Sequence, residues 1–224
     1  MTEIPKIPSR WRLVTNLQQG KIETLDDSHL VAPTARRSPL TPLLSGLLPN
    51  RDHNEELVRD LRVIPRNRAA AQPIFAVFAA DPFIEGKQIT QTLFEKGYRR
   101  IVNWPTTAQY GREFSEALDS VNLGPRQEYE NLQRLADRGL SISLAVCTAD
   151  RAMDVASIRP EIVFLAPTFD LWVNGKMRSS ELLRRCAALA RVVQGSVPIV
   201  LMTTRGAVSL TQAIDVGATG LLVA

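Results

Sequence analysis

The sequence has few of the residues that build metal sites, disulfide frameworks and membrane spans. Only two cysteines and two histidines occur among its 224 residues, and Cys147 and Cys186 share no motif spacing. This argues against a disulfide scaffold or a cysteine-rich metal site and is typical of a reducing compartment. No apolar run approaches the roughly 20 residues of a membrane helix, and the first residues lack the pattern of an export signal. We therefore expect a soluble, cytoplasmic protein with no membrane partner.

The chain also has no long run of charge of one sign. The net charge is +4, and arginine supplies 22 of the 27 basic residues, but these are scattered along the sequence. The absence of a basic cluster argues against nucleic acid as a partner. Arginine binds carboxylate and phosphate groups in a bidentate manner, so its excess over lysine favours a small anionic ligand.

From residue 73 onward, short apolar runs alternate with helical stretches, a pattern typical of βα units around a parallel sheet. Composition and length suit one domain spanning residues 1–224. The runs are apolar almost throughout, as expected of strands covered on both faces. Strands are predicted at 73–79, 99–104, 141–147, 162–167, 198–203 and 220–224. Helices are predicted at 86–96, 127–137, 149–156, 179–194 and 209–216, and a further one at 54–62.

Six strands indicate a TIM-like (β/α)8 parallel barrel with a shortened, irregular N-terminal part. A short helix is predicted at 11–19 and strands at 21–24 and 29–32, with only Asp26, Asp27 and Ser28 between the two strands. A parallel crossover needs about a dozen residues, so the usual first βα unit is expected to be shortened or absent. We assign 1–27 to an N-terminal helix and extension, and 28–224 to the barrel.

The sequence reaches Ala224 within its last predicted strand, so no eighth helix is expected. An uncovered apolar strand attracts further pairing. The N-terminal helix or a second copy of the chain is expected to cover this side, and the latter predicts a homo-oligomer.

Two predicted strands end on polar residues that a folding core would not choose. The run 74–79 leads to Asp81, and the run 101–102 leads to Asn103. The carboxyl ends of parallel strands form the face where α/β proteins keep their sites. We expect the carboxylate and the amide to lie side by side and open into a shared cup.

Several motifs of the chain resemble those of the phosphoenolpyruvate hydrolase-like TIM-barrel family, which is related to phosphoenolpyruvate mutase and phosphonopyruvate hydrolase barrels. They are the segments 45–49, 80–83 and 102–106, with Asp52, Asn54, Gly124, Glu128 and Glu130. The similarity extends over about residues 28–224. The resemblance implies a lyase or hydrolase that cleaves a C–C or C–P bond of a small 2-oxo acid or phosphoenolpyruvate-like anion.

Two strand ends depart from the family pattern. Ala166-Pro167-Thr168 stands where the family tends to carry His-Met-Gly, and Thr203-Thr204-Arg205 stands where it tends to carry His-Gly-Gly. The histidines could act in acid–base chemistry, and the glycines allow close backbone approach to an anion. Their loss supports a second hypothesis, in which a catalytically degenerate barrel serves as a ligand-sensing or protein-assembly module.

The candidate catalytic residues are Asp81, Asn103, Thr106 and Glu128. The resemblance implies that Asp81 acts as a general base or as a ligand of Mg²⁺, the candidate metal. The alternative is an Asx-turn, which an Asp before a proline also favours. Asn103 and Thr106 could hydrogen-bond a carboxylate or enolate oxygen, or they could satisfy loop amides. Glu128 could reach the barrel mouth, or it could favour a positive helix start.

The candidate substrate-binding residues are Arg37, Trp104, Tyr110, Thr203 and Arg205. Arg37 and Arg205 follow predicted strands and could bind the acid group of the substrate, with a surface ion pair as the alternative for Arg205. Trp104 could exclude water from the site. Tyr110 lies with Arg112 and Glu113 in a predicted loop of the kind that forms a lid, although solvated loop polarity explains them too.

Overall fold

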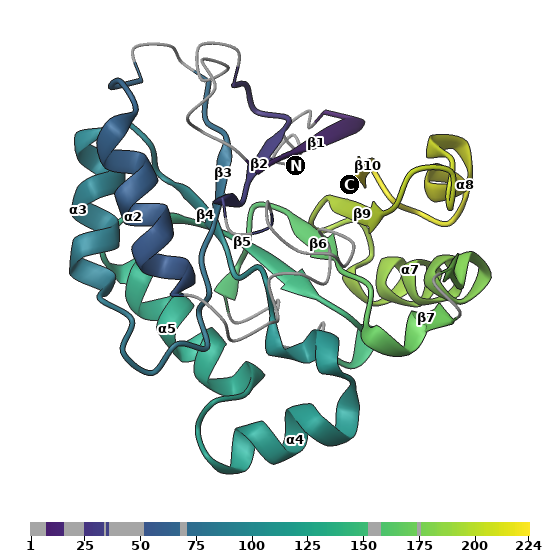
Figure 1. Ribbon diagram of the computed structural model, residues 1–224. Helices are drawn as coiled ribbons and strands as arrows, with labels where there is room; N and C mark the ends of the chain where they lie inside the picture. The colour runs from purple at the N-terminus through teal and green to yellow at the C-terminus, as the bar shows by residue number, and fades with distance from the viewer. Residues whose placement is uncertain are drawn as a thin grey trace.

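A closed barrel of eight parallel strands forms the centre of the molecule, as the computed structural model in Figure 1 shows. The structure describes residues 8–15, 25–33, 35, 52–67, 71–151, 158–173 and 176–224. Around the barrel the strands follow the order β1-β10-β9-β6-β5-β4-β3-β2. Their bounds are β1 Arg10–Val14, β2 His29–Val31, β3 Ile74–Ala76, β4 Arg100–Val102, β5 Ser141–Val146, β6 Val163–Leu165, β9 Ile199–Thr203 and β10 Gly220–Val223.

Helices pack around the outside of the barrel and alternate with its strands (Figure 1). The described α-helices are α2 His53–Val63, α3 Gly86–Glu95, α4 Arg112–Ser120, α5 Pro125–Asp137, α7 Ser179–Val193 and α8 Leu210–Asp215. A 3-10 helix η3, Thr107–Tyr110, precedes α4, and another, η5 Phe169–Leu171, follows β6. A short antiparallel pair, β7 Trp172–Val173 and β8 Lys176–Met177, follows η5. This confirms the TIM-like barrel, and within the described residues no helix follows β10.

Alternate residues of each strand face two separate apolar clusters. In β4, Ile101 packs with the helices, whereas Val102 belongs to the cluster that fills the barrel. In β5, Leu144 faces the helices and Ala145 faces the interior. This alternation follows from the two-residue period of a strand, and it decides which side chains can reach the barrel axis.

The N-terminal segment is a strand of the barrel, so the prediction of a helix at 11–19 is wrong. β1 pairs with β10 on one side and with β2 on the other, and it closes the barrel. Trp11 is buried inside, with its ring edge-on to Phe164 at 5.3 Å between centroids, while Arg10 and Arg12 are exposed. This alternation has the period of a strand. No N-terminal helix covers the barrel in the described residues, and the strand predicted at 21–24 lies outside them.

The remaining predicted strands and most helices lie where the apolar pattern places them. Helices α3, α5 and α7 end close to Gly97, Gly139 and Gly195, all of which have positive φ. Part of the helix predicted at 149–156 lies outside the described residues. The prediction of a lid-like loop around Tyr110 is wrong, because the segment folds into η3 and α4.

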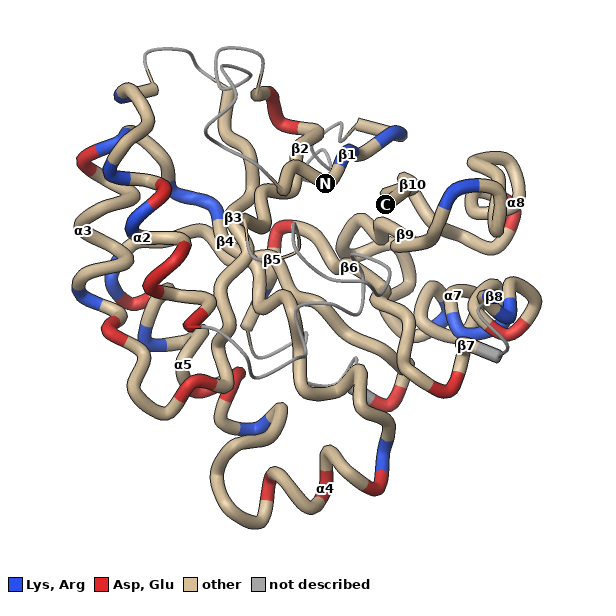
Figure 2. Tube along the Cα trace, in the orientation of Figure 1, with Lys and Arg blue, Asp and Glu red and all other residues tan. Residues whose placement is uncertain are grey.

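Charges of both signs are distributed over the outer helices (Figure 2). Several are paired along a helix, as Arg126 and Glu130 are on α5, with 3.7 Å between Nε and Oε1. Such exposed pairs each contribute at most about 1 kcal/mol. None of the described helices is both long and apolar enough to cross a membrane.

Candidate functional site

Asp81 lies in the turn after β3 and is partly exposed. Its Oδ1 accepts a hydrogen bond from the Phe83 backbone N–H at 2.9 Å, which is the Asx-turn contact. Its Oδ2 accepts one from Asn54 Nδ2 at 3.0 Å. Asn54, on α2, also bonds both backbone groups of Phe78. The carboxylate is therefore held in one orientation while keeping exposed surface.

Asn103 continues β4 and points toward the helix layer, because it has the same parity as Ile101. The side chain has no exposed surface. Its Nδ2 donates to Glu128 Oε2 at 2.8 Å and to the Ala145 carbonyl at 3.3 Å, and its Oδ1 accepts from the Ala145 N–H at 2.7 Å. Donors and acceptor of this amide are all engaged within the protein.

Glu128, in the first turn of α5, is the centre of a buried polar cluster. In addition to Asn103, Thr106 Oγ1 donates to its Oε2 at 2.8 Å, and the backbone N–H and Oγ1 of Thr107 donate to Oε1, each at 2.6 Å. Burial raises the pKa of Glu128, while the hydrogen bonds from Thr107, Asn103 and Thr106 oppose that rise. The cluster fixes the start of η3 against α5.

The structure brings three of the predicted catalytic residues together, but beneath the surface. Asn103, Thr106 and Glu128 are at most 1% exposed and bond one another between sheet and helix. Asp81 has different partners. The expected cup shared by Asp81 and Asn103 is therefore wrong, because a two-residue period turns Asn103 away from the barrel mouth.

The predicted substrate-binding residues are spread over several environments. Trp104 lies in the barrel interior at 1% exposure. Thr203 is buried, with its Oγ1 at 3.5 Å from Met177 Sδ. Arg205 is exposed in the turn after β9. Arg37 lies outside the described residues.

Tyr110 belongs to an aromatic group at the end of η3. Its ring centroid is 4.9 Å from that of Phe114 and 5.6 Å from that of Phe169. Burial raises the pKa of Tyr110. The group connects α4 with η5, the segment after β6.

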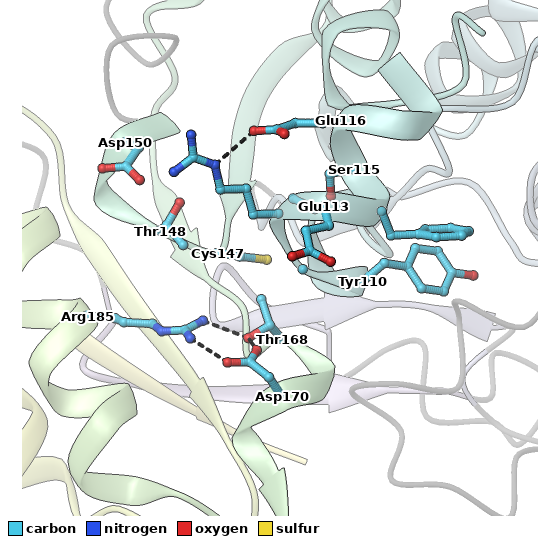
Figure 3. Close-up of a pocket in the computed structure, with 14 residues that line it drawn as sticks. Tyr110, Glu113, Ser115, Glu116, Cys147, Thr148, Asp150, Thr168, Asp170 and Arg185 are labelled. Atoms are coloured by element: carbon cyan, nitrogen blue, oxygen red, sulfur yellow. Dashed lines mark hydrogen bonds and ion pairs between the residues drawn. The ribbon is translucent and has the colours of Figure 1, made fainter. Parts of the chain in front are cut away.

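A cavity of about 1000 Å³ lies beside this aromatic group (Figure 3). Its lining comes from the carboxyl ends of β5 and β6, from η3 and α4, and from α7. The lining residues include Ala108, Tyr110, Arg112, Glu113, Cys147, Thr148, Asp150, Thr168, Asp170 and Arg185. The cavity is thus on the face of the barrel where (β/α)8 enzymes carry their active sites.

Arg185, on α7, forms one wall of the cavity and contacts Thr168, just before η5, and Asp170 in η5. Its Nη2 lies 2.8 Å from Asp170 Oδ2, its Nη1 donates to Thr168 Oγ1 at 2.6 Å, and its Nε lies 3.1 Å from Glu181 Oε1. A hydrogen bond from Arg184, with further help from Arg185, lowers the pKa of Glu181 to about 2.

The second arginine of the cavity, Arg112, is also paired. Its Nε lies 2.8 Å from Glu116 Oε1 on the same helix. Since Arg112 and Arg185 both have carboxylate partners, an anionic ligand has to compete with those partners for either guanidinium.

The family model of phosphoenolpyruvate hydrolase-like proteins matches residues 34–202, more than half of the sequence. The chain belongs to this family. The match includes the turn of Asp81, the buried cluster around Glu128 and the strands β3 to β6. It confirms the resemblance seen in the sequence motifs.

An uncharacterised protein of Sinorhizobium fredii, y4oT, is 30% identical over 113 residues, which are 50% of this chain and 56% of that protein. The chain thus spans about half the length of the relative it matches.

Three solved structures of similar fold are distant in sequence from this chain. A candidate phosphonomutase from Burkholderia cenocepacia has a TM-score of 0.55 at 10% identity, covering 96% of this chain and 86% of that one. The aldolase QR15 has a TM-score of 0.51 at 11% identity, covering 100% and 92%. A flavocytochrome b2 variant with benzoylformate has a TM-score of 0.51 at 15% identity, covering 97% and 56%. Identities this low show the fold alone.

The described residues of this phosphoenolpyruvate hydrolase-like protein do not form a metal site of their own. Nowhere among them do three or more His, Cys, Asp or Glu side chains gather so as to hold an ion. The two oxygens of Asp81 already accept hydrogen bonds. Asp81 alone does not provide the donor set that a protein-held Mg²⁺ needs.

The cavity contains residues that the sequence reasoning missed. Thr148 and Thr168 follow β5 and β6 as Asp81 follows β3, so their positions after predicted strands also indicate a site at this face of the barrel. Thr168 was interpreted only as a departure from the family pattern. The sequence does not indicate a role for Arg185 in the site, because its contact with Asp170 joins residues that are 15 positions apart.

Proposed function

We propose that this phosphoenolpyruvate hydrolase-like protein is a lyase or hydrolase acting on a small 2-oxo acid or phosphoenolpyruvate-like anion. One observation carries the proposal: the cavity of about 1000 Å³ at the carboxyl ends of β5 and β6. This is where barrels of this type place their substrates. Family membership supports the substrate class, as do the names of the phosphonomutase and aldolase neighbours.

In this proposal Asp81 is the general base, since it is the only predicted catalytic residue that is not fully buried in the described structure. Asp81 does not line the cavity, so the proposal requires the bound substrate to extend from the cavity toward the turn after β3. Asn54 orients its carboxylate. Asn103, Thr106 and Glu128 act at a distance by fixing η3, which lines the cavity through Ala108 and Tyr110. The acid group of the substrate is bound by Arg185 on the cavity wall or by Arg205 after β9.

A second candidate function is binding without turnover, as a sensing or assembly module. It is favoured because Asn103, Thr106 and Glu128 are buried and are hydrogen-bonded within the protein. Groups whose hydrogen bonds are all made within the protein stabilise the fold but offer nothing to a substrate.

One experiment separates the two functions. The purified protein is incubated with pyruvate, oxaloacetate, phosphonopyruvate and phosphoenolpyruvate, with and without Mg²⁺, and both binding and product formation are followed. An enzyme should release product, and Asp81→Asn should lower the rate about 100-fold or more. The matched control, Asp215→Asn on exposed α8, should keep the wild-type rate. Saturable binding without product would favour the sensing module, and no binding of any acid would end the enzyme proposal and the sensing proposal.

A further inference from the structure

The cavity on the barrel face has far more room than pyruvate needs. Its volume of about 1000 Å³ is at the upper end of the range that drug-sized ligands fill. Pyruvate bound at Arg185 would leave most of this space to water. The rest of the lining therefore indicates what a better-matched ligand carries besides its acid group.

One wall of the cavity is aromatic. Tyr110 and Phe114 both line it, with 4.9 Å between their ring centroids. Phe169 stacks on Tyr110 at 5.6 Å, with 29° between the ring planes, and supports that ring. Phe114 is 52% exposed, although a large apolar side chain is more stable when it is covered. A second ring packs well on such a wall, in an offset-stacked or edge-on arrangement.

The aromatic wall and the arginine wall lie on different sides of the cavity. Figure 3 shows Tyr110 and Arg185 at opposite sides of the drawn residues, with Thr168 and Asp170 between them in this view. The two walls also come from different elements, because Tyr110 ends η3 and Phe114 lies in α4, whereas Arg185 lies in α7. A ligand that reaches both walls must therefore carry its acid group at one end and its apolar group at the other.

The described lining has more negative than positive side chains. Four carboxylates and two guanidinium groups line the cavity, from Glu113, Glu116, Asp150, Asp170, Arg112 and Arg185. A hydrogen bond to Glu116 raises the pKa of Arg112, and the charge of Asp150 adds to this rise. Each further negative charge on a ligand meets the surplus of carboxylates. One carboxylate can share Arg185 with Asp170, whereas the several charges of a phosphorylated acid are disfavoured.

We propose that the cavity selects a 2-oxo monocarboxylic acid with an aromatic side group, its carboxylate at Arg185 and its ring against Phe114 and Tyr110. The inference rests on the proposed function and narrows its substrate class to arylpyruvate-like acids, in preference to pyruvate and phosphoenolpyruvate. Phe114 is then a residue that determines specificity, because its ring covers more apolar area on an aryl group than on a methyl group.

The test uses phenylpyruvate, pyruvate and phosphoenolpyruvate as probes. Affinities are measured by calorimetry for wild type, Phe114→Ala and Phe114→Tyr. Wild type should bind phenylpyruvate about tenfold or more tightly than pyruvate, as expected for the burial of a phenyl ring, and phosphoenolpyruvate no more tightly than pyruvate. Phe114→Ala should reduce the preference for phenylpyruvate to about threefold or less, while its affinity for pyruvate stays unchanged. Phe114→Tyr retains the ring and should retain the preference.

The control is Val121→Ala, because Val121 caps the same helix, is 61% exposed and does not line the cavity. It should keep the preference, and thermal unfolding shows whether each variant is folded. The comparison of the three acids on wild type needs no variant, so it decides the ligand class even if Phe114→Ala does not fold.

Three results would overturn the inference and leave the proposed function standing. They are equal binding of phenylpyruvate and pyruvate by wild type, tighter binding of phosphoenolpyruvate than of phenylpyruvate, and a preference that survives in folded Phe114→Ala. Failure of all three acids to bind would instead contradict the proposed function itself.

Discussion

The carboxylate of Glu128 and the side-chain amide of Asn103 meet between β4 and α5, with 2.8 Å between Oε2 and Nδ2. Through Ala145 the same amide also joins β4 to β5. The contact connects residues that are 25 positions apart in a region with no exposed surface. Two residues predicted to act on a substrate thus hold β4, β5 and α5 together beneath the cavity.

Replacing Asn103 with aspartate should be severely destabilising. Asn103→Asp keeps the acceptor for the Ala145 N–H but places a second carboxylate against Glu128. Breaking a buried charged contact costs about 3–5 kcal/mol, and we expect a loss of that size in the free energy of unfolding in urea. The control Asn122→Asp, in an exposed turn, should change stability by no more than about 0.5 kcal/mol. Similar values for the two variants would show that the buried contact is unimportant.

The free energy of unfolding should depend on pH through the titration of Glu128. Burial raises the pKa of Glu128 above its usual 4.5. A carboxyl with a raised folded-state pKa contributes stability that is fully present below the unfolded value and is lost as pH rises through the folded value. The stability of wild type minus that of Glu128→Gln should therefore fall as pH rises above about 4.5 in urea unfolding.

Glu130→Gln is the matched control for this pH experiment, because Glu130 lies on the same helix with its side chain 49% exposed. Its difference from wild type should change little with pH. If the Glu128 difference instead grows with pH, the four hydrogen bonds to the carboxylate outweigh its burial.

The sequence was sufficient to predict most of the barrel, because its strands are continuous apolar runs. The exception was β1, where the segment from Trp11 onward fits an amphipathic helix as well as a strand. Pairing with β10 and β2, which are distant in sequence, decides between the two. Local pattern alone could not decide it, since tertiary contacts override propensity.

The site was harder to predict, for a related reason. A strand of a parallel barrel is apolar on both faces, so the pattern does not show which face is inside. Asn103 directly follows β4, whereas Asp81 lies in the turn five residues after the end of β3. The sequence could not show that Asn103 points outward and its neighbour Trp104 inward. Because of this parity, Asn103 lies between β4 and α5, where it bonds Glu128, and Trp104 points toward the barrel axis.

Gly217, after α8, should tolerate alanine less well than Gly195, after α7. Both have positive φ, at 93° and 73°, so an added Cβ costs about 1 kcal/mol at either position. At Gly217 that Cβ would also lie 2.6 Å from the Cβ of Ala190, whereas at Gly195 nothing lies within 4 Å. Thermal unfolding should show Gly217→Ala destabilised by about 2 kcal/mol or more, including the cost of overpacking. Equal losses would mean that α7 and α8 separate easily.

Arg185 and Arg205 compete for the role of binding the acid group of the ligand. Arg185 lies on the cavity wall and is held by Asp170, whereas Arg205 is exposed and does not line the cavity. If the acid binds in the cavity, Arg185→Gln should weaken pyruvate binding about tenfold or more, as expected for a lost charged hydrogen bond. Arg205→Gln should have less than about a twofold effect.

The control for this comparison is Arg184→Gln, because Arg184 also contacts Glu181 but has its side chain 70% exposed. It should preserve binding, which separates ligand contact from a general loosening of α7. Calorimetry gives the affinities, and thermal unfolding shows whether each variant is folded. The reverse pattern, with Arg205 sensitive and Arg185 not, would place the acid group at the end of β9, next to one of the two arginines, Arg37 and Arg205, that the sequence predicts for this role. The carboxylates already paired with Arg185 would then be structural partners only.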